Sequence, residues 1–316
     1  MDVIFMGTPD FAVATLDSLE RAGHRIVLVV TQPDKPKGRG KKMAMSPVKE
    51  WAVERDIPVY QPSKIREAGS VEHILSIPCD VSVVAAFGQI LPREILEHPR
   101  YGCVNVHASL LPKYRGAAPI QWSILNGDEV TGITTMQMGV GLDDGDILQQ
   151  QIVPIEEEDT GGSLFDRLAL VGGELLVKTL KGLEEGSITP QPQDESQATH
   201  VGMIRKDMGK LDFTRSAEEL SRYVRGLNPW PGTYTFTEGK TLKFWKAFAI
   251  PENDLDEDTK SAPLASVVRA DDTGVYVRCK EGVLAATELQ LEGKKRMAVS
   301  DYLRGHAMET GELLGH

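Results

Sequence analysis

Polar side chains suited to proton transfer and anion stabilisation gather between Cys103 and Asp146. Asn105 and His107 stand two residues apart at the end of a short apolar run, so on a strand they share one face. An amide can stabilise a developing oxyanion, and an imidazole exchanges protons near neutral pH. Asp143 follows in a glycine-rich turn. This set predicts a polar site that needs neither a metal nor a covalent nucleophile.

An isolated Asn-x-His pair is more often a loop cap, because side-chain to backbone hydrogen bonds are common. Here the pair is followed by Ser-Leu-Leu-Pro, Arg-Gly-Ala-Ala-Pro and Gly-Leu-Asp-x-Gly-Asp. As a set, these motifs resemble the folate-dependent formyltransferases. The resemblance implies the catalytic residues Asn105, His107 and Asp143, and a formyl-folate loop of Ser109, Leu110, Leu111 and Pro112.

Two adjacent acids, Asp143 and Asp144, are candidates for the carboxylate beside His107. A tight turn points neighbouring side chains in different directions, so one of them at most can face the imidazole. Asp143, directly after Leu142, fits the family's acid best.

The elements that position these residues alternate between apolar strands and amphipathic helices. Nearly continuous apolar runs at 3–7, 25–33, 79–87 and 102–106 are typical of a parallel sheet covered on both faces. Helices are predicted after Gly7, at 68–75 and at 163–183. We therefore predict a Rossmann-like open α/β sheet over residues 1–188. NAD binding is not expected, because the glycine fingerprint is missing.

Ligand crevices of such sheets lie outside the carboxyl ends of the strands. Phe87 and Gly88 end one of the predicted strands there, and we predict that they contact the folate.

Residues 189–205 are polar, contain proline and lack periodicity, which predicts a linker. Short alternating runs separated by turns follow the helix that begins after Ser216, and they predict antiparallel strands. The C-terminal domain, 206–316, is therefore expected to be an OB-like β-barrel, as in the family's second domain. Trp230, in the turn Asn-Pro-Trp-Pro-Gly, is predicted to anchor packing rather than to stack on bases.

The chain has 316 residues and a net charge of −11. No apolar run approaches the roughly 20 residues needed to span a bilayer, and the first residues enter a strand without a signal segment. The three cysteines, Cys79, Cys103 and Cys279, show neither metal-ligand nor disulfide spacing. We expect a cytoplasmic protein without a metal or a membrane partner.

A basic segment follows the second predicted strand. It carries Lys35, Lys37, Arg39, Lys41 and Lys42. Like charges repel each other, so a mobile loop is predicted, and composition alone favours a solvated surface loop. The amino-acid sequence of the segment nevertheless resembles the basic insertion of those family members that act on methionyl-tRNA. The resemblance then implies tRNA contacts for these five residues.

On that resemblance the acceptor is the amine of initiator methionyl-tRNA and the donor is 10-formyltetrahydrofolate, for translation initiation. DNA is not an expected partner, and a monomer is expected. One alternative is a formyltransferase for a sugar nucleotide or another small amine. A second is a non-catalytic RNA-binding protein that has kept the fold.

Replacing Arg39, Lys41 and Lys42 with Ala should weaken tRNA binding, because each neutralised phosphate releases counterions. The slope of log K against log salt should flatten by roughly one to three units. Binding titrations at several salt concentrations measure this slope, and affinity for formyl-folate serves as the control. An unchanged slope would leave the segment a solvated surface feature.

Overall fold

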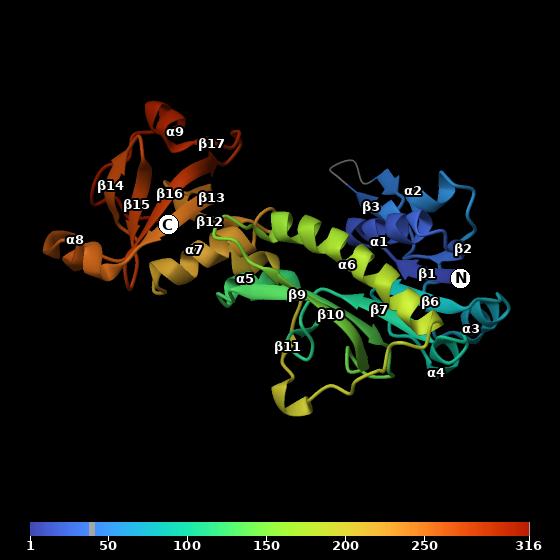
Figure 1. Cartoon of the computed structure of the whole chain (residues 1–316). Coiled ribbons are helices and arrows are strands. Elements are labelled where there is room, and N and C mark those ends of the chain that lie inside the picture. Colours follow the sequence, from blue (N-terminus) through green and yellow to red (C-terminus); the bar gives the residue numbers. More distant parts are fainter. Residues whose placement is uncertain (38–41, 316) are drawn as a thin grey trace. The chain divides into compact units, whose positions relative to one another are not determined.

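The computed structural model describes residues 1–37 and 42–315, and of Lys37 and Lys42 it describes only the backbone. The chain forms two compact units (Figure 1). Unit 1 comprises Met1–Pro119, Val130–Pro154 and Phe165–Val201, and unit 2 comprises Ile120–Glu129, Ile155–Leu164 and Gly202–His316.

Unit 1 is built on a seven-stranded sheet. Its strands are β1 (Asp2–Gly7), β2 (Arg25–Val30), β5 (Val59–Tyr60), β6 (Val81–Ala85), β7 (Cys103–His107), β9 (Val130–Gln137) and β10 (Asp146–Pro154). They lie in the order β10-β9-β7-β6-β1-β2-β5. The last five of this order run parallel, whereas β9 and β10 are antiparallel to their neighbours. The predicted Rossmann-like open sheet is confirmed.

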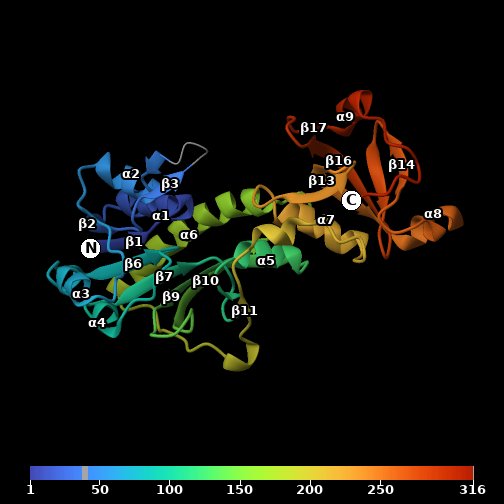
Figure 2. The same ribbon diagram turned by 180° about the vertical axis from the view of Figure 1, so that it is seen from behind.

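Helices cover both faces of this sheet (Figures 1 and 2). They are α1 (Asp10–Arg21), α2 (Pro47–Val53), α3 (Ala68–Leu75), α4 (Arg93–Leu96) and α6 (Gly161–Glu184), which enters unit 1 at Phe165. α1 and α6 meet on one face, where the rings of Phe11 and Phe165 are 5.5 Å apart in an edge contact. Ile74 of α3 and Ile95 of α4 share an apolar core on the other face.

Two glycines let α6 approach its neighbours closely. A Cβ atom at Gly173 would lie 2.2 Å from Oγ of Ser18 and 2.9 Å from the carbonyl oxygen of Ala14. A Cβ at Gly172 would lie 2.9 Å from Cγ1 of Val106 in β7. α6 therefore packs directly on α1 and on the strand that carries Asn105 and His107.

Unit 2 contains an antiparallel sheet, as predicted. Its strands are β12 (Thr233–Thr237), β13 (Lys240–Ile250), β14 (Val267–Asp271), β15 (Gly274–Arg278), β16 (Val283–Leu291) and β17 (Met297–Ala298). The order is β12-β13-β16-β15-β14, and β17 pairs with β16. The helices are α5 (Pro119–Leu125, from Ile120 on), α7 (Ala217–Gly226), α8 (Glu257–Ser261) and α9 (Val299–Gly305).

The C-terminal tail joins the two outer strands of that sheet. The N–H of Val267 in β14 donates to the carbonyl of Glu312, and the N–H of Gly315 donates to the carbonyl of Phe236 in β12, each over 2.8 Å. Pairing of edge strands removes exposed backbone groups and brings an open sheet towards a barrel.

The basic segment differs in part from the prediction of a loop. β3 (Lys35–Lys37) and β4 (Lys42–Ala44) pair antiparallel. Backbone pairing does not require apolar side chains, and a two-stranded ribbon consists of edges, where Pro36 is tolerated. Arg39 and Lys41 lie outside the described residues.

The segment predicted to be a linker makes specific contacts within unit 1 as far as Val201. Gln191 exchanges two backbone hydrogen bonds with Ile147, of 2.8 and 2.9 Å. β11 (His200–Val201) pairs in parallel with β8 (Arg115–Gly116). Non-periodic polar residues suggested a linker, whereas the fold uses several of them as hydrogen-bonding groups. The domain limits 1–188 and 206–316 stay a prediction.

Gly173→Ala should destabilise the protein by about 1–3 kcal/mol, because the added methyl group meets the backbone of α1. Gly69→Ala in α3 is the matched control, since a Cβ there has nothing within 4 Å. The control should change stability by less than about 1 kcal/mol. Circular dichroism during unfolding in urea gives the midpoint for each variant. Equal midpoints for Gly173→Ala and Gly69→Ala would contradict the close packing of α6 on α1.

Candidate active site

Asn105 and His107 lie two apart on β7, at its carboxyl end. β7 pairs with β6 along one edge and with β9 along the other, so its register is fixed from both sides. Both residues are buried, with 8% and 6% of their surfaces exposed. Buried polar groups cost free energy unless they are paired, so the partners of these two residues indicate how they are used.

One ring nitrogen of His107 makes a hydrogen bond, and the other faces a carboxylate. Nε2 lies 2.9 Å from the backbone carbonyl oxygen of Tyr114, and Nδ1 lies 3.7 Å from Oδ2 of Asp143. Because a carbonyl oxygen only accepts hydrogen bonds, we assign the proton of the neutral ring to Nε2. Nδ1 is then the nitrogen that carries no proton in the neutral ring, and it faces the carboxylate.

Asp143 adopts φ +51°, a left-handed conformation that Asp tolerates better than most residues. Its Oδ2 accepts a 2.8 Å hydrogen bond from the N–H of Gly116. The carboxylate of Asp144 instead folds over Gly141 within the same turn. Of the two adjacent acids, Asp143 is the one that lies beside His107.

The side chain of Asn105 has no hydrogen-bond partner among the residues that the structure describes. An amide offers two donors and an acceptor. Next to a histidine whose ring is already fixed, this side chain is available to a ligand's oxygen.

The loop after β7 is fixed by its backbone and by buried polar side chains. Thr134 Oγ1 donates to the carbonyl of Ser109 and accepts from the N–H of Leu111. Ser109 Oγ donates to the carbonyl of Lys113 over 2.6 Å. Ser109 and Leu111 are buried, whereas Leu110 and Pro112 are half-buried. The two half-buried side chains are therefore the ones that a bound molecule could contact.

Phe87 and Gly88 follow β6, and they differ in how accessible they are to a ligand. The side chain of Phe87 is buried in the core with Met6 and Val30. Its carbonyl accepts from Nε2 of Gln32 over 3.1 Å. Gly88 is exposed and has φ +80°. At Phe87 the ring supports the sheet, so Gly88 is the residue that a ligand could approach.

The basic segment is described only in part. Lys35 is exposed. Lys37 and Lys42 are known by backbone alone, and Arg39 and Lys41 lie outside the described residues. The predicted tRNA contacts of this segment stay a prediction.

Sequence reasoning missed a polar network behind the turn of Asp143. Gln193 Nε2 donates to the carbonyls of Asp143 and Gly145, over 2.8 and 2.7 Å. Arg115 is buried and donates to Oε1 of Gln193 and to both carboxylate oxygens of Glu195. The hydrogen bond with Glu195 raises the pKa of Arg115. No sequence pattern marks a single glutamine in a polar stretch.

Cys103, which opens β7, is not a candidate nucleophile. It is fully buried, and burial raises the pKa of its thiol to about 12. The thiolate is the reactive form of cysteine, so this side chain belongs to the core.

Unit 2 carries an exposed tryptophan, Trp230, and a half-buried one, Trp245, that lies beside basic side chains. The prediction that Trp230 anchors packing is wrong, because 58% of its surface is exposed. Lys243 and Arg296 lie over the ring of Trp245, with Nζ and Cζ 5.3 and 5.2 Å from its centroid. Aromatic rings flanked by cations are typical of surfaces that bind nucleic acid.

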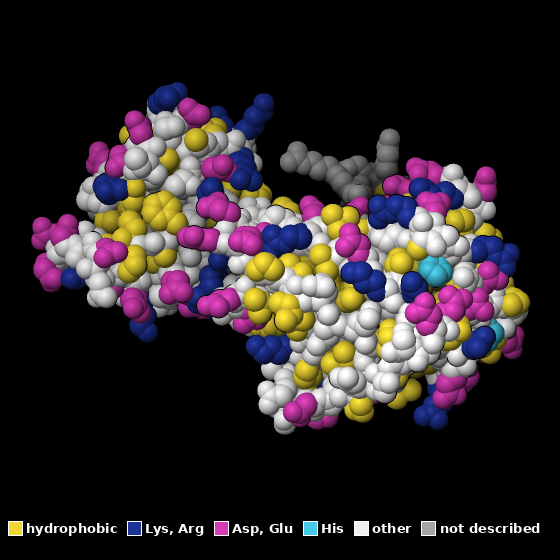
Figure 3. Space-filling model, viewed as in Figure 1, with side chains coloured by type: hydrophobic (Ala, Val, Ile, Leu, Met, Phe, Trp, Pro, Cys, Tyr) yellow, Lys and Arg dark blue, Asp and Glu magenta, His cyan; other side chains and the backbone are white. Residues whose placement is uncertain are grey.

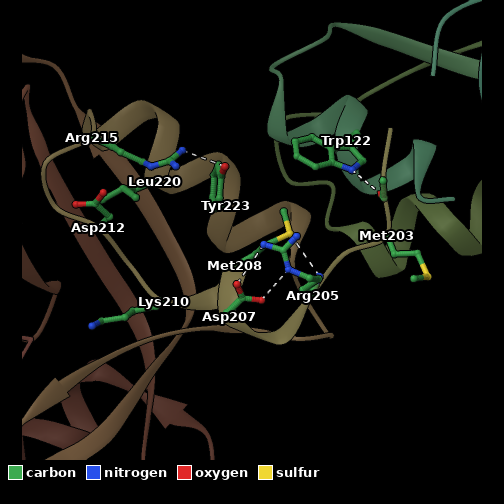
Figure 4. Close-up of a pocket in the computed structure, with 11 residues that line it drawn as sticks. Trp122, Met203, Arg205, Asp207, Met208, Lys210, Asp212, Arg215, Leu220 and Tyr223 are labelled. Atoms are coloured by element: carbon green, nitrogen blue, oxygen red, sulfur yellow. Dashed lines mark hydrogen bonds and ion pairs between the residues drawn. The ribbon is translucent and has the colours of Figure 1, made fainter. Parts of the chain in front are cut away.

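A separate cavity of about 350 Å³ lies in unit 2 (Figure 4). Trp122 borders it, and its Nε1 donates to the carbonyl of Gly202. Arg205 is paired with Asp207, and Arg215 donates to the hydroxyl of Tyr223. Lys210 and Asp212 also border the cavity, so its lining carries charges of both signs.

Charge is mixed over the surface, with acidic and basic side chains interspersed on the visible face of each unit (Figure 3). In the part of the chain that the structure describes, no three His, Cys, Asp or Glu side chains are grouped to hold a metal ion. Every helix within residues 1–37 and 42–315 is too short or too polar to cross a bilayer.

Comparisons with known proteins agree with this arrangement. The family model "Formyl transferase" matches residues 1–180, and "Formyl transferase, C-terminal domain" matches residues 203–307. The chain is 52% identical to the methionyl-tRNA formyltransferase of Lachnospira eligens, over 100% of both chains. It is 47% identical to that of Clostridioides difficile, again over 100% of both.

Two solved structures share the fold. The sugar 3N-formyl transferase WlaRD is 18% identical, with a TM-score of 0.66 over 93% of this chain and 99% of that one. HypX from Aquifex aeolicus in complex with tetrahydrofolic acid is 16% identical, with a TM-score of 0.61 over 95% of this chain and 46% of HypX.

Proposed function

The chain belongs to the formyl transferase family, and we propose that it transfers the formyl group of 10-formyltetrahydrofolate to the amine of initiator methionyl-tRNA. The observation that carries the proposal is identity of about half the residues with methionyl-tRNA formyltransferases over the whole chain. The reaction serves translation initiation, which takes place in the cytoplasm.

Formyl transfer joins the amine nitrogen to the formyl carbon and breaks the bond from that carbon to N10 of the folate. The attacking amine must be neutral, and an α-amino group has a pKa of about 7.7–8. The tetrahedral intermediate carries negative charge on the formyl oxygen. The amine loses one proton, and the departing nitrogen gains one. The site therefore needs an oxyanion donor and a group that exchanges protons.

Asn105 and His107 fit these two needs. The amide of Asn105, which has no hydrogen-bond partner among the described residues, would donate to the formyl oxygen. His107 would exchange a proton at Nδ1, since its Nε2 proton is held by the carbonyl of Tyr114. Asp143, 3.7 Å from that nitrogen, would orient the ring and stabilise its charged form.

The folate would lie against the half-buried Leu110 and Pro112 and the exposed Gly88, with Ser109 and Leu111 fixing the loop from within. A mixture of apolar contacts and a few placed polar groups is typical of small-molecule sites. When bound, this co-substrate supplies the activated one-carbon group. No metal is part of the proposal.

The tRNA would need more surface than the crevice, because nucleic acid affinity comes largely from phosphate contacts. We assign this role to the basic segment at residues 35–42 and to residues 206–316. Exposed Trp230 and the cations over Trp245 support the second assignment. A monomer without a DNA or membrane partner remains our expectation.

The alternative acceptor is a small amine such as a sugar nucleotide, as the name of WlaRD indicates for that protein. At 18% identity the likeness shows a shared fold and no more. The relatives that are identical at about half the residues favour methionyl-tRNA as the acceptor of the formyl group.

The purified protein should produce formyl-methionine from charged initiator tRNA and 10-formyltetrahydrofolate. Mass spectrometry of the released amino acid measures it. Acetylated methionyl-tRNA is the control, because its amine is blocked and should not react. Formylation of an amino sugar nucleotide with none of methionyl-tRNA would favour the alternative acceptor.

Asn105→Ala and His107→Ala should each lower turnover by roughly two to four orders of magnitude, the usual scale for oxyanion and acid–base groups. Neither side chain is expected to contact phosphate, so tRNA binding should change little. Near-normal turnover of either variant would contradict its catalytic role.

Asp143→Asn and Asp144→Asn form a matched pair of neighbouring, isosteric changes. Asp143→Asn should lower turnover steeply, because it removes the negative charge beside Nδ1 of His107. Asp144→Asn should have little effect, since its carboxylate folds over Gly141. Steady-state kinetics compares them, and a larger loss from Asp144→Asn would reverse the assignment.

A further inference from the structure

Residues 191–195 lie directly against the turn that carries Asp143. Backbone hydrogen bonds between Gln191 and Ile147 fix the segment to the start of β10. Two residues later, the amide of Gln193 spans the turn and donates to the carbonyls of Asp143 and Gly145. A single side chain thus holds the turn on both sides of Asp144.

Arg115 decides which way the amide of Gln193 points. Arginine has only donors, so the amide oxygen of Gln193 must face it. Nε and Nη2 of Arg115 reach that oxygen over 3.1 and 2.9 Å. The amide nitrogen is then directed at the two carbonyls, and its two protons are both used.

Arg115 is itself fixed. Its side chain is 4% exposed and forms a two-pronged ion pair with Glu195, over 3.1 and 2.7 Å. The next residue, Gly116, donates to the carboxylate of Asp143. Gly116 has φ +116°, and a Cβ there would lie 2.3 Å from the carbonyl oxygen of Val201. β8 therefore contacts the carboxylate of Asp143 directly through Gly116, and Arg115 reaches the backbone of the turn through Gln193.

Asp143 needs such support because its left-handed backbone is an unfavourable conformation for a residue with a side chain. Loss of the hydrogen bond at its carbonyl would let the turn relax, and the carboxylate would move with it. We propose that Gln193, oriented by Arg115, is a positioning residue that holds the Asp143 carboxylate beside Nδ1 of His107. This inference rests on the proposed function.

Gln193→Glu tests the proposal with almost no change in shape. A carboxylate keeps the acceptor that Arg115 uses, but it has no proton for the carbonyls of Asp143 and Gly145. The matched control is Gln151→Glu on β10, an exposed position with the same change of charge. Its amide reaches only the adjacent carbonyl of Ile152 among the described residues.

The expected result is a fall in kcat of about 10- to 100-fold, the scale known for residues that orient the ligands of a metal ion from behind. KM for formyl-folate should change less than about threefold, since the folate loop is separate from this network. Gln151→Glu should keep normal kcat. A general loss of structure would instead lower the thermal midpoint, which is measured for each variant.

A double-mutant cycle separates positioning from a structural role. If Gln193 acts through Asp143, then Gln193→Glu should cost less than about threefold in kcat when Asp143→Asn is already present. Full additivity of the two losses would overturn the proposal, as would normal kcat in Gln193→Glu.

Arg115→Lys provides a second variant if Gln193→Glu fails to fold. Lysine keeps the charge opposite Glu195 but loses the fork that orients Gln193. It should lower kcat and show the same lack of additivity with Asp143→Asn, and additivity would again overturn the proposal. A wild-type protein that forms no formyl-methionine would instead refute the proposed function. An active wild type, an impaired Asp143→Asn and a normal Gln193→Glu would refute this inference alone.

Discussion

Pairing of β7 along both of its edges is the constraint on which the site depends. Hydrogen bonds to β6 and β9 leave the strand one register, and a slip by one residue would turn Asn105 and His107 to the opposite face. α6 packs on the same strand through Gly172. The two polar side chains are thus held by a buried strand that is fixed on both edges and packed against α6, which gives a reaction site its precise geometry.

His107 can serve in a reaction because other segments fix its surroundings. The loop after β7 offers the carbonyl of Tyr114, the turn before β10 offers Asp143, and residues 191–195 hold that turn. Each segment satisfies a polar group that would be costly to bury alone. The ring therefore has one fixed tautomer and one nitrogen left for chemistry.

An acidic protein that acts on tRNA must attract the phosphates through local groups of positive side chains. The net charge is −11, and on the face drawn in Figure 3 the acidic and basic side chains are interspersed rather than separated. Many cations, such as Arg205 and Arg222, are paired with acids. Lys243 and Arg296 lie over the ring of Trp245, and Arg296 is also paired with Glu288. They combine a charge with a flat aromatic face, a pairing that suits nucleic acid without a strongly positive surface.

The sequence by itself determined the periodic features: the parallel strands, the long helix at α6, the antiparallel strands after Ser216 and the pair Asn105 and His107 on one strand. These follow from local patterns, because burial repeats every two or about 3.6 residues. It could not place Phe87 in the core, Trp230 in solvent or Gln193 behind Asp143. Each depends on contacts between segments distant in the chain, and a side chain of the same type serves equally well in a loop, a core or a site. Only the tertiary structure decided those positions, because a hydrogen-bond partner 50 residues away leaves no trace in local sequence.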